Sequence, residues 1–250
     1  MNRVMCHLVA GYPDMERSLL AAEAMAEGGA SYLEVQFPFT DPAADGPAIQ
    51  DASTRALEAG FTMREGFRLV EKIAAAVPLV PIFIMTYGSL AVRRGVDSFL
   101  KMTKDAGAAG VIIPDLPFDY DEGLYAAGDK TGIDVVPVVV PHIAGERLAG
   151  IRNLSPNYLY AALRAGITGP RTELGTETIA FLKRLRGWDT KVFAGFGITS
   201  GRQVAALAPY AEAAVVGSRL VGVIKENARA EHDAFRRAVA AAVAELCGAP

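Results

Sequence analysis

Apolar residues recur along the chain in short runs, and stretches with a helical period of apolar positions separate them. Runs of Val, Ile, Leu and Phe without polar alternation are typical of parallel strands that are covered on both faces. They predict strands over 4–11, 31–39, 79–87, 109–115, 134–141, 158–164, 191–197 and 213–218. The amphipathic stretches predict helices over 14–27, 48–58, 63–76, 95–106, 119–130, 144–153, 175–186, 201–208 and 230–246. Eight strands alternating with helices in 250 residues predict a (β/α)8 TIM barrel.

The same pattern also bears on the number of domains. No low-complexity stretch, charge run or linker divides residues 1–250, which predicts a single domain. Two helical stretches follow the second strand where one is usual, and insertions in barrels commonly lie where function is built, at the carboxyl ends of the strands. Alternation alone does not show that the sheet closes, so a doubly wound open sheet stays an alternative.

The strand predicted over 31–39 carries a carboxylate inside an apolar segment. Its period of two places Glu34 on the same face as Tyr32 and Gln36. The apolar members of the run occupy the opposite face: Leu33, Val35 and Phe37. A polar line on one face of an otherwise buried strand indicates a chemical role.

The loop after this strand holds two further carboxylates, Asp41 and Asp45, between Pro42 and Pro47. A glutamate on the inner face of a barrel strand is partly desolvated, so it can act as both acid and base near neutrality. We expect Asp45 to stay ionised as a hydrogen-bond acceptor. Two carboxylates in contrasting environments can then divide the acid and base roles between them. Asp41 is consistent with a structural role, and a structural reading of the whole set stays open.

Glycines and small hydroxyl side chains gather near the last strands. Residues 195–200 read Gly-Phe-Gly-Ile-Thr-Ser, residues 217–218 read Gly-Ser, and residues 165–169 read Ala-Gly-Ile-Thr-Gly. Glycine lets backbone N–H groups approach an anion, and barrels often bind phosphate at the loops after strands 7 and 8. These turns therefore predict a phosphate site, unless each glycine merely turns the chain.

The sequence gives little support for a metal site, a cofactor site or a nucleic-acid interface. His7, His142 and His232 have no metal-ligand spacing, and no Walker or dinucleotide-binding pattern is present, so neither a metal nor a cofactor is expected. A net charge of −3 does not indicate a nucleic-acid partner. No signal peptide or run of 18 apolar residues is found, which predicts a cytoplasmic protein that does not interact with membranes.

Several motifs in order along the chain resemble those of the tryptophan synthase alpha subunit family. They are EVQFPFTDPAADGP at 34–47, PDLP at 114–117, RAGITG at 164–169, GFGIT at 195–199 and VGSRLV at 216–221. The resemblance implies a (β/α)8 barrel that cleaves indole-3-glycerol phosphate to indole and glyceraldehyde 3-phosphate without a cofactor. It also implies a pyridoxal-phosphate beta subunit as partner, in a tetramer of two alpha and two beta chains, which receives indole through a tunnel.

By position, the resemblance assigns roles to single residues. It implies Glu34 as acid–base catalyst, Asp45 as the acceptor for the indole N–H, and Tyr160 as a neighbour of the substrate. The residues implied on the substrate phosphate side are Thr168, Gly169, Gly197, Gly217 and Ser218. Residues 41–47 and 165–175 match two mobile loops that close over the substrate and communicate with the beta subunit.

The chemistry of the residues agrees with this assignment. Breaking the bond from indole C3 to the glycerol carbon requires protonation of C3 and deprotonation of the adjacent hydroxyl, which one glutamate can do in turn. Asp45 would stabilise positive charge on the indole nitrogen. We expect an apolar wall for the ring from Phe37, Ile49, Ile112 or Tyr87.

The chain departs from the family pattern in three places. Gln36 stands where the family usually has Gly and could alter loop 41–47, and Ser89 stands where Asn is expected, at a position used toward the partner. The chain starts almost at the first strand, without the usual short helix. The changed partner positions leave open a stand-alone lyase that releases indole. Two further alternatives are a phosphate-binding isomerase or epimerase and a mainly regulatory partner of a beta subunit.

Overall fold

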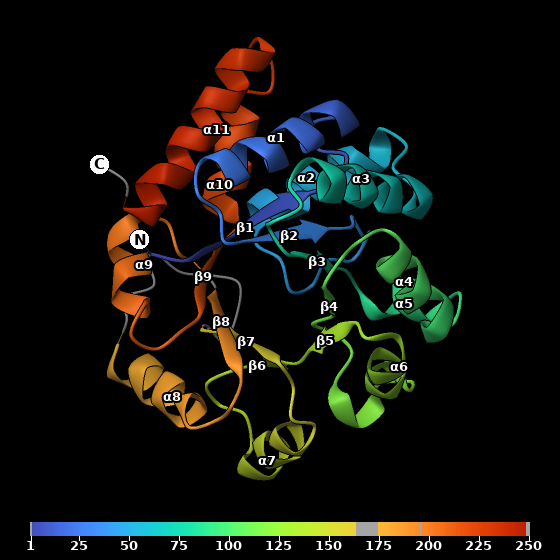
Figure 1. The fold of residues 1–250 in the computed structure, drawn as a ribbon, viewed down its shortest axis with the longest axis vertical. Coiled ribbons are helices and arrows are strands. Elements are labelled where there is room, and N and C mark those ends of the chain that lie inside the picture. The colour runs from blue at the N-terminus through green and yellow to red at the C-terminus, as the bar shows by residue number, and fades with distance from the viewer. Residues whose placement is uncertain (1, 164–174, 196, 249–250) are drawn as a thin grey trace.

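Parallel strands form a ring at the centre of the protein, and helices surround it (Figure 1). The computed structural model describes residues 2–163, 175–195 and 197–248. The strands are β1 (Val4–Val9), β2 (Tyr32–Gln36), β3 (Ile82–Met85), β4 (Gly110–Ile112), β5 (Asp134–Val136), β6 (Val138–Val139), β7 (Tyr158–Ala162), β8 (Lys191–Gly195) and β9 (Ala213–Val216). They are hydrogen-bonded in the order β5-β4-β3-β2-β1-β9-β8-β7-β6. The TIM-barrel prediction is confirmed.

The two ends of this strand order, β5 and β6, are consecutive in the chain and separated by Pro137 alone. β5 pairs with β4, and β6 pairs with β7, so the segment 134–139 links both edges. Proline has no N–H to donate to a ladder, which accounts for the break in the strand predicted over 134–141. The carbonyl of Pro137 still accepts a hydrogen bond from the N–H of Tyr160 at 2.9 Å. The alternative of an open doubly wound sheet is therefore wrong.

The helices follow the strands in alternation. They are α1 (Met15–Glu27), α2 (Pro47–Glu58), α3 (Met63–Ala76), α4 (Gly88–Val92), α5 (Val96–Asp105), α6 (Leu124–Thr131), α7 (Gly145–Asn153), α8 (Thr176–Arg186), α9 (Gly201–Leu207), α10 (Ser218–Glu226) and α11 (His232–Cys247). A short 3-10 helix covers Phe118–Tyr120. None of the described helices is long and apolar enough to cross a membrane.

Two of these helices, α4 and α10, are absent from the sequence-based prediction. α4 has only five residues, too few to show a helical period. α10 begins at Ser218, inside the strand predicted over 213–218, because β9 ends at Val216 and Gly217 turns the chain. The two helices predicted after the second strand are confirmed as α2 and α3.

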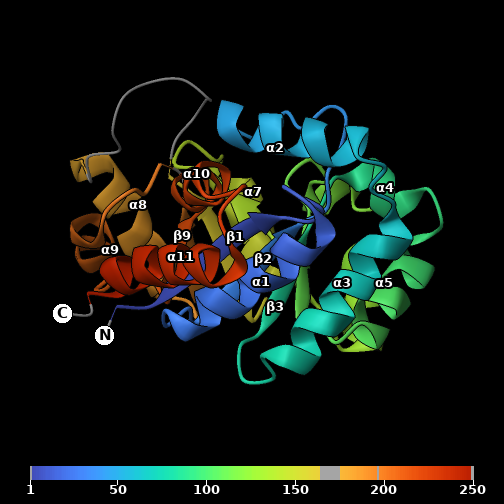
Figure 2. The ribbon, with the colours of Figure 1, turned by 90° about the horizontal axis from the view of Figure 1, so that it is seen from above.

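Local sequence signals explain where these two helices begin. α2 starts with Pro47, whose fixed φ suits the first helical position, and α3 begins with a capping box between Thr62 and Glu65. In Figure 2, α2 lies along the upper edge of the molecule, above β1 and β2. The loop 37–46 therefore carries the chain from the carboxyl end of β2 to the start of α2.

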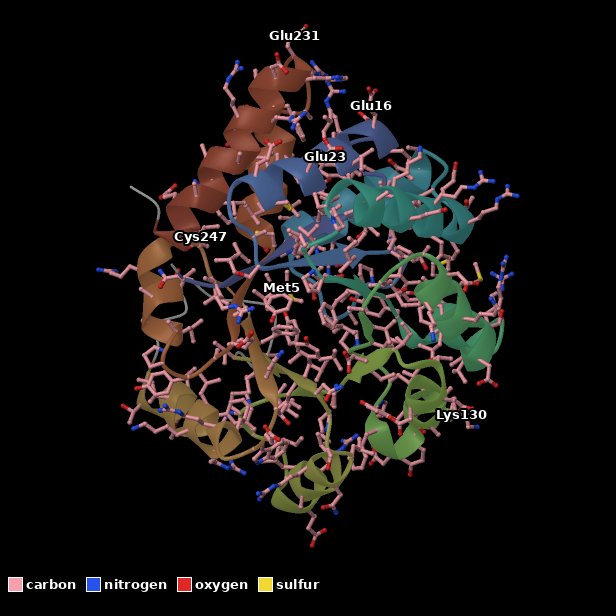
Figure 3. All side chains as sticks on the ribbon, in the orientation of Figure 1. Met5, Glu16, Glu23, Lys130, Glu231 and Cys247 are labelled. Atoms are coloured by element: carbon pink, nitrogen blue, oxygen red, sulfur yellow. The ribbon has the colours of Figure 1, made fainter. Side chains whose placement is uncertain are left out.

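The strands divide their side chains between the barrel interior and the surrounding helices. Met5 lies within the ring of strands, whereas Glu16, Lys130 and Glu231 lie at the outer margin (Figure 3). Met5 and Tyr32 belong to an inner apolar cluster, in which Tyr32 makes edge contacts with the rings of Phe83 and Phe193. Leu33 and Val35 belong to the larger cluster between strands and helices. The predicted two faces of β2 are confirmed.

Helix α1 packs closely against α11 at Gly28, the residue that caps α1. A Cβ atom on Gly28 would lie 2.5 Å from the backbone oxygen of Ala240 and 2.7 Å from the Cβ of Val243. Gly222 in α10, by contrast, has no atom within 4 Å of the place where its Cβ would be. The two glycines therefore differ in packing.

We predict that Gly28→Ala lowers the free energy of unfolding by about 1–3 kcal/mol, because the helices must move apart. Gly222→Ala is the control and should raise it by about 0.5–1 kcal/mol, since alanine favours a helix interior. Urea unfolding followed by circular dichroism measures both. Equal effects of the two substitutions would contradict this packing of α1 on α11.

Candidate active site

A cavity of about 400 Å³ opens at the carboxyl ends of the strands. Its lining includes β-strand residues, the loop 43–47, the start of α2, and residues 197–199 and 217–218. A smaller hollow of about 210 Å³ lies among α3, α4 and α5, and its lining contains two arginines but neither a carboxylate nor a histidine. Only the first of these two cavities brings together the predicted acid–base groups.

Glu34 lies on the wall of this cavity and is paired with His7. The Nδ1 atom of His7 lies 2.6 Å from Oε2 of Glu34, and the two side chains are 4% and 5% exposed. The residues are direct partners in the parallel pairing of β1 with β2, so the barrel backbone itself sets them side by side. The sequence indicated His7 only as a candidate metal ligand and gave no sign that it pairs with Glu34.

The pKa of His7 reflects two opposing effects. Burial by itself lowers the pKa of the imidazole, because a buried cation loses its hydration. The hydrogen bond and charge of Glu34, together with the charge of Asp45, outweigh burial, so that the pKa of His7 is raised overall. The pair is therefore arranged to hold a proton.

Asp45 is also buried, although it lies on a loop. It is 5% exposed, and its Oδ2 atom accepts hydrogen bonds from Nε2 of Gln36 at 2.6 Å and from the hydroxyl of Tyr87 at 2.9 Å. Tyr87 also accepts a hydrogen bond from the N–H of Ala44, which ties the loop to the barrel a second time. Gln36 itself is fully buried. The expectation that Gln36 affects loop 41–47 therefore has a physical basis.

The expected difference in environment between the two carboxylates is wrong, because both side chains are buried. Burial raises the pKa of Asp45, and the charge of His7 with the hydrogen bonds from Gln36 and Tyr87 offsets only part of this effect. Asp45 thus lies in a desolvated environment like that of Glu34, because the loop folds back into the barrel mouth. Asp41 is exposed on the same loop.

Tyr160 on β7 lines the cavity, as predicted. Its pKa is raised by burial and by the charges of Glu34 and Asp45, so its hydroxyl stays protonated. Gly195 on the neighbouring strand leaves room for it, because a Cβ there would lie 2.7 Å from the Tyr160 hydroxyl. The tyrosine can therefore act as a hydrogen-bond donor at neutral pH.

Three of the predicted phosphate-side residues line the same cavity: Gly197, Gly217 and Ser218. Gly197 has a positive φ of 77°, and Gly217 precedes the first turn of α10; the start of a helix is a favourable place for an anion. Thr168 and Gly169 lie outside the described residues, as does most of the predicted loop 165–175.

The predicted apolar wall is correct for two of its four members. Ile49 and Ile112 line the cavity. Tyr87 instead donates its hydroxyl to Asp45. The prediction for Phe37 is wrong. The alternation of side chains along β2 places Phe37 outside the barrel, where it packs against Phe61 and Phe67. Met85, Val138 and Val215 supply further apolar lining.

Ser89, a second departure from the family pattern, lies exposed in α4 and is not among the residues that line the cavity. Among the described residues, no group of three or more His, Cys, Asp or Glu side chains is placed to hold a metal ion.

Comparison with known proteins places these features in a family. A model of the tryptophan synthase alpha chain family matches residues 2–247. The chain is 37% identical to the tryptophan synthase alpha chain of Helicobacter hepaticus over 230 residues, which are 90% of this chain and 86% of that one. It is 39% identical to that of Natronomonas pharaonis over 228 residues, covering 88% and 81% of the two chains.

Solved structures are similar over almost the whole chain. The tryptophan synthase A-subunit from Pyrococcus furiosus superposes with a TM-score of 0.88 at 32% identity, covering 99% of this chain and 98% of that one. Tryptophan synthase from Mycobacterium tuberculosis superposes with a TM-score of 0.87 at 33% identity, covering 99% and 92%.

We predict that Asp45→Asn stabilises the fold at neutral pH. A group whose folded-state pKa is raised favours folding below its unfolded pKa of about 3.9 and loses that contribution as pH rises through the folded value. Asparagine keeps the shape without the charge, so the variant should gain about 1 kcal/mol at pH 7, a usual scale for stabilising changes. The gain should shrink toward pH 4.

Urea unfolding at the two pH values measures this difference. Asp41→Asn, on the exposed part of the same loop, is the matched control and should change little. A variant at position 45 that is less stable than the parent at pH 7 would show that the charge is better solvated than its burial indicates.

Proposed function

This chain belongs to the tryptophan synthase alpha chain family, lyases of tryptophan biosynthesis that cleave indole-3-glycerol phosphate, and we propose that Glu34 and Asp45 carry this reaction here. One observation carries the proposal: a single cavity of about 400 Å³ is lined by both carboxylates, Tyr160 and the glycine turns. Acid–base groups and candidate anion-binding groups on the lining of one cavity suit a phosphorylated substrate with a scissile carbon–carbon bond.

Glu34 is the proposed acid–base catalyst. In its protonated state it gives a proton to C3 of the indole ring, and the resulting carboxylate takes the proton of the adjacent glycerol hydroxyl as the carbon–carbon bond breaks. The electron pair of that bond returns to the indole ring, which leaves as neutral indole beside glyceraldehyde 3-phosphate. Glu34 ends protonated, as it began.

Asp45 is the proposed acceptor for the indole N–H. Its Oδ2 atom is held by Gln36 and Tyr87, while Oδ1 takes no hydrogen bond from the described residues. Protonation of C3 places positive charge on the ring nitrogen, and a fixed carboxylate beside it stabilises that charge in a site of low polarity. Ile49 and Ile112 would contact the ring.

The phosphate group is proposed to bind at the glycine turns and the start of α10, which line the same cavity. Gly197, Gly217 and Ser218 support this through exposed backbone groups and the N-terminal turn of α10. Thr168 and Gly169 are proposed to complete this phosphate site, on the resemblance of their motif. Binding of the phosphate orients the reacting bond and contributes binding energy remote from it.

The family pairs with a beta subunit, and we propose a tetramer of two alpha and two beta chains for this protein as well. The solved relatives from Mycobacterium tuberculosis are tryptophan synthase structures, which supports this assembly. We also propose that residues 1–250 act as a single domain. A cytoplasmic location stays a prediction.

We predict that Glu34→Gln lowers kcat for cleavage of indole-3-glycerol phosphate by about 10²–10⁴-fold, the usual contribution of a general acid–base group. Binding of glycerol 3-phosphate, measured by calorimetry, should be largely unchanged because the residues proposed to bind the phosphate are not altered. Glu58→Gln, exposed on α2, is the control and should retain full activity. Equal losses of turnover and phosphate binding would contradict the proposed role.

The hydrogen bond from Gln36 to Asp45 favours a second possibility, appreciable lyase activity without the beta subunit. The side chain of Asp45 is already fixed to the barrel at 2.6 Å and 2.9 Å in the isolated chain. A beta subunit that activates the enzyme by ordering loop 41–47 would then increase the lyase activity by a smaller factor.

We predict that Gln36→Gly, which restores the residue usual in the family, lowers kcat of the isolated chain about tenfold, in keeping with the loss of a hydrogen bond to a charged group. Addition of a beta subunit should recover more activity in this variant than in the parent. Gln36→Met, which keeps the length of the side chain without its amide, should behave like the glycine variant.

The same assay distinguishes the alternatives. An identical activation ratio in parent and variants would show that Gln36 does not replace the partner. Absence of turnover with and without the beta subunit would contradict the lyase activity and favour a regulatory role.

A further inference from the structure

The pair of His7 and Glu34 is built into the barrel wall. β1 and β2 are paired in parallel with His7 opposite Glu34, so neither side chain depends on a loop for its position. The Nδ1 to Oε2 distance is 2.6 Å, which is short for a hydrogen bond between nitrogen and oxygen. Both residues line the cavity that the substrate is proposed to occupy.

Stability alone does not account for this pair. A buried ion pair is weak evidence for stability, because desolvation can exceed the attraction between the charges. The other nitrogen of the imidazole, Nε2, is buried and has no hydrogen-bond partner among the described residues. A buried polar atom left without a partner costs about 1–3 kcal/mol. An apolar side chain at this position would avoid that cost.

The charges around His7 all favour a proton on the pair. Glu34 faces it from β2, and Asp45 acts on it from the loop after β2. Tyr160 faces Glu34 and Asp45 from β7 as a neutral hydroxyl. On the other side of β1, the residues of β9 are the apolar Ala213–Val216. No lysine or arginine occurs among the described residues that line the cavity.

We propose that His7 is a positioning residue that shares one proton with Glu34, so that the two groups act as a proton-holding pair in the lyase reaction. This inference rests on the proposed function of Glu34 and adds a second group to it. His7 acts through Glu34 and need not touch the substrate.

The pair holds the same number of protons before and after one turnover. The pair starts with one proton between Nδ1 and Oε2, and that proton passes through Glu34 to C3 of the indole ring. As the carbon–carbon bond breaks, Glu34 takes the proton of the glycerol hydroxyl, and the pair again holds one proton.

The advantage of the pair lies in its pH range. A lone carboxylate must itself be protonated at the start of the reaction, whereas the pair carries the proton as long as either partner holds it. Coupled groups lose their protons in two steps that belong to the pair, and the second step sets the alkaline limit of activity. His7 therefore extends activity toward higher pH.

The test is the pH profile of kcat in His7→Asn. Asparagine offers an amide donor to Glu34 but cannot carry the exchangeable charge. We expect kcat at pH 8.5 to fall about 100-fold, within the range of acid–base contributions, with a smaller loss at pH 6 and little change in KM. The alkaline fall of kcat should move to lower pH.

Two further variants separate this role from packing. His232→Asn changes an exposed histidine in α11 and should leave the profile unchanged. His7→Phe fills the space without a hydrogen bond and should show the same shift as the asparagine variant. A profile of His7→Asn with the shape of the parent profile, whatever its height, would overturn the proposal.

A measurement without turnover keeps the inference separate from the proposed function. Titration of the His7 imidazole by nuclear magnetic resonance should give a midpoint above the ordinary value of about 6.5 in the parent chain and a lower one in Glu34→Gln. An unchanged midpoint in Glu34→Gln overturns the shared proton even if the chain is active. Absence of lyase activity with the expected midpoints overturns the proposed function and retains the pair.

Discussion

Burial of charge inside an apolar barrel is the constraint on which the site depends. Glu34 and Asp45 are 4% and 5% exposed, so solvent cannot stabilise their charges and each requires a partner from the protein. Glu34 is paired with His7 on β1, and Asp45 is bonded by Gln36 on β2 and by Tyr87 just after β3. Since β1, β2 and β3 are neighbours in the sheet, strand order supplies all of these partners.

The site is unfavourable for stability, and other parts of the fold compensate. Nε2 of His7 and Oε1 of Gln36 are buried without a hydrogen-bond partner among the described residues. Buried polar atoms of this kind are rare in proteins and call for a reason. The large apolar cluster between the strands and the helices, to which Leu33 and Val35 belong, offsets their cost. Such a division of stability and function is common in active sites.

Two kinds of wall line the cavity. The acid–base groups are side chains on strands, and the loop that carries Asp45 is tied to those strands by hydrogen bonds. Elsewhere on the lining, backbone turns at Gly197 and Gly217 and the start of α10 form the wall. Side chains with defined positions suit proton transfer, whereas backbone N–H groups suit recognition of an anion.

Local sequence patterns determined much of this protein. The apolar runs and helical periods specified the alternation of parallel strands and helices, and a period of two placed Glu34 and Gln36 on one face of β2 and Leu33 and Val35 on the other. The same rule placed Phe37 outside as well, which is at odds with the expectation that Phe37 contributes to the apolar wall. Motifs located the loop of Asp45 and the glycine turns of the last strands, because these signals depend on neighbours in the chain.

Contacts between distant segments were decided only by the tertiary structure. The register of β1 against β2 sets His7 beside Glu34, 27 residues away in sequence. The folding of loop 41–47 into the barrel mouth buries Asp45, which sequence alone placed in an environment unlike that of Glu34. Closure of the sheet through a strand broken at Pro137, and the start of α10 directly after β9, likewise depend on the whole ring of strands. Strand register and burial are properties of the closed barrel, and no local pattern encodes them.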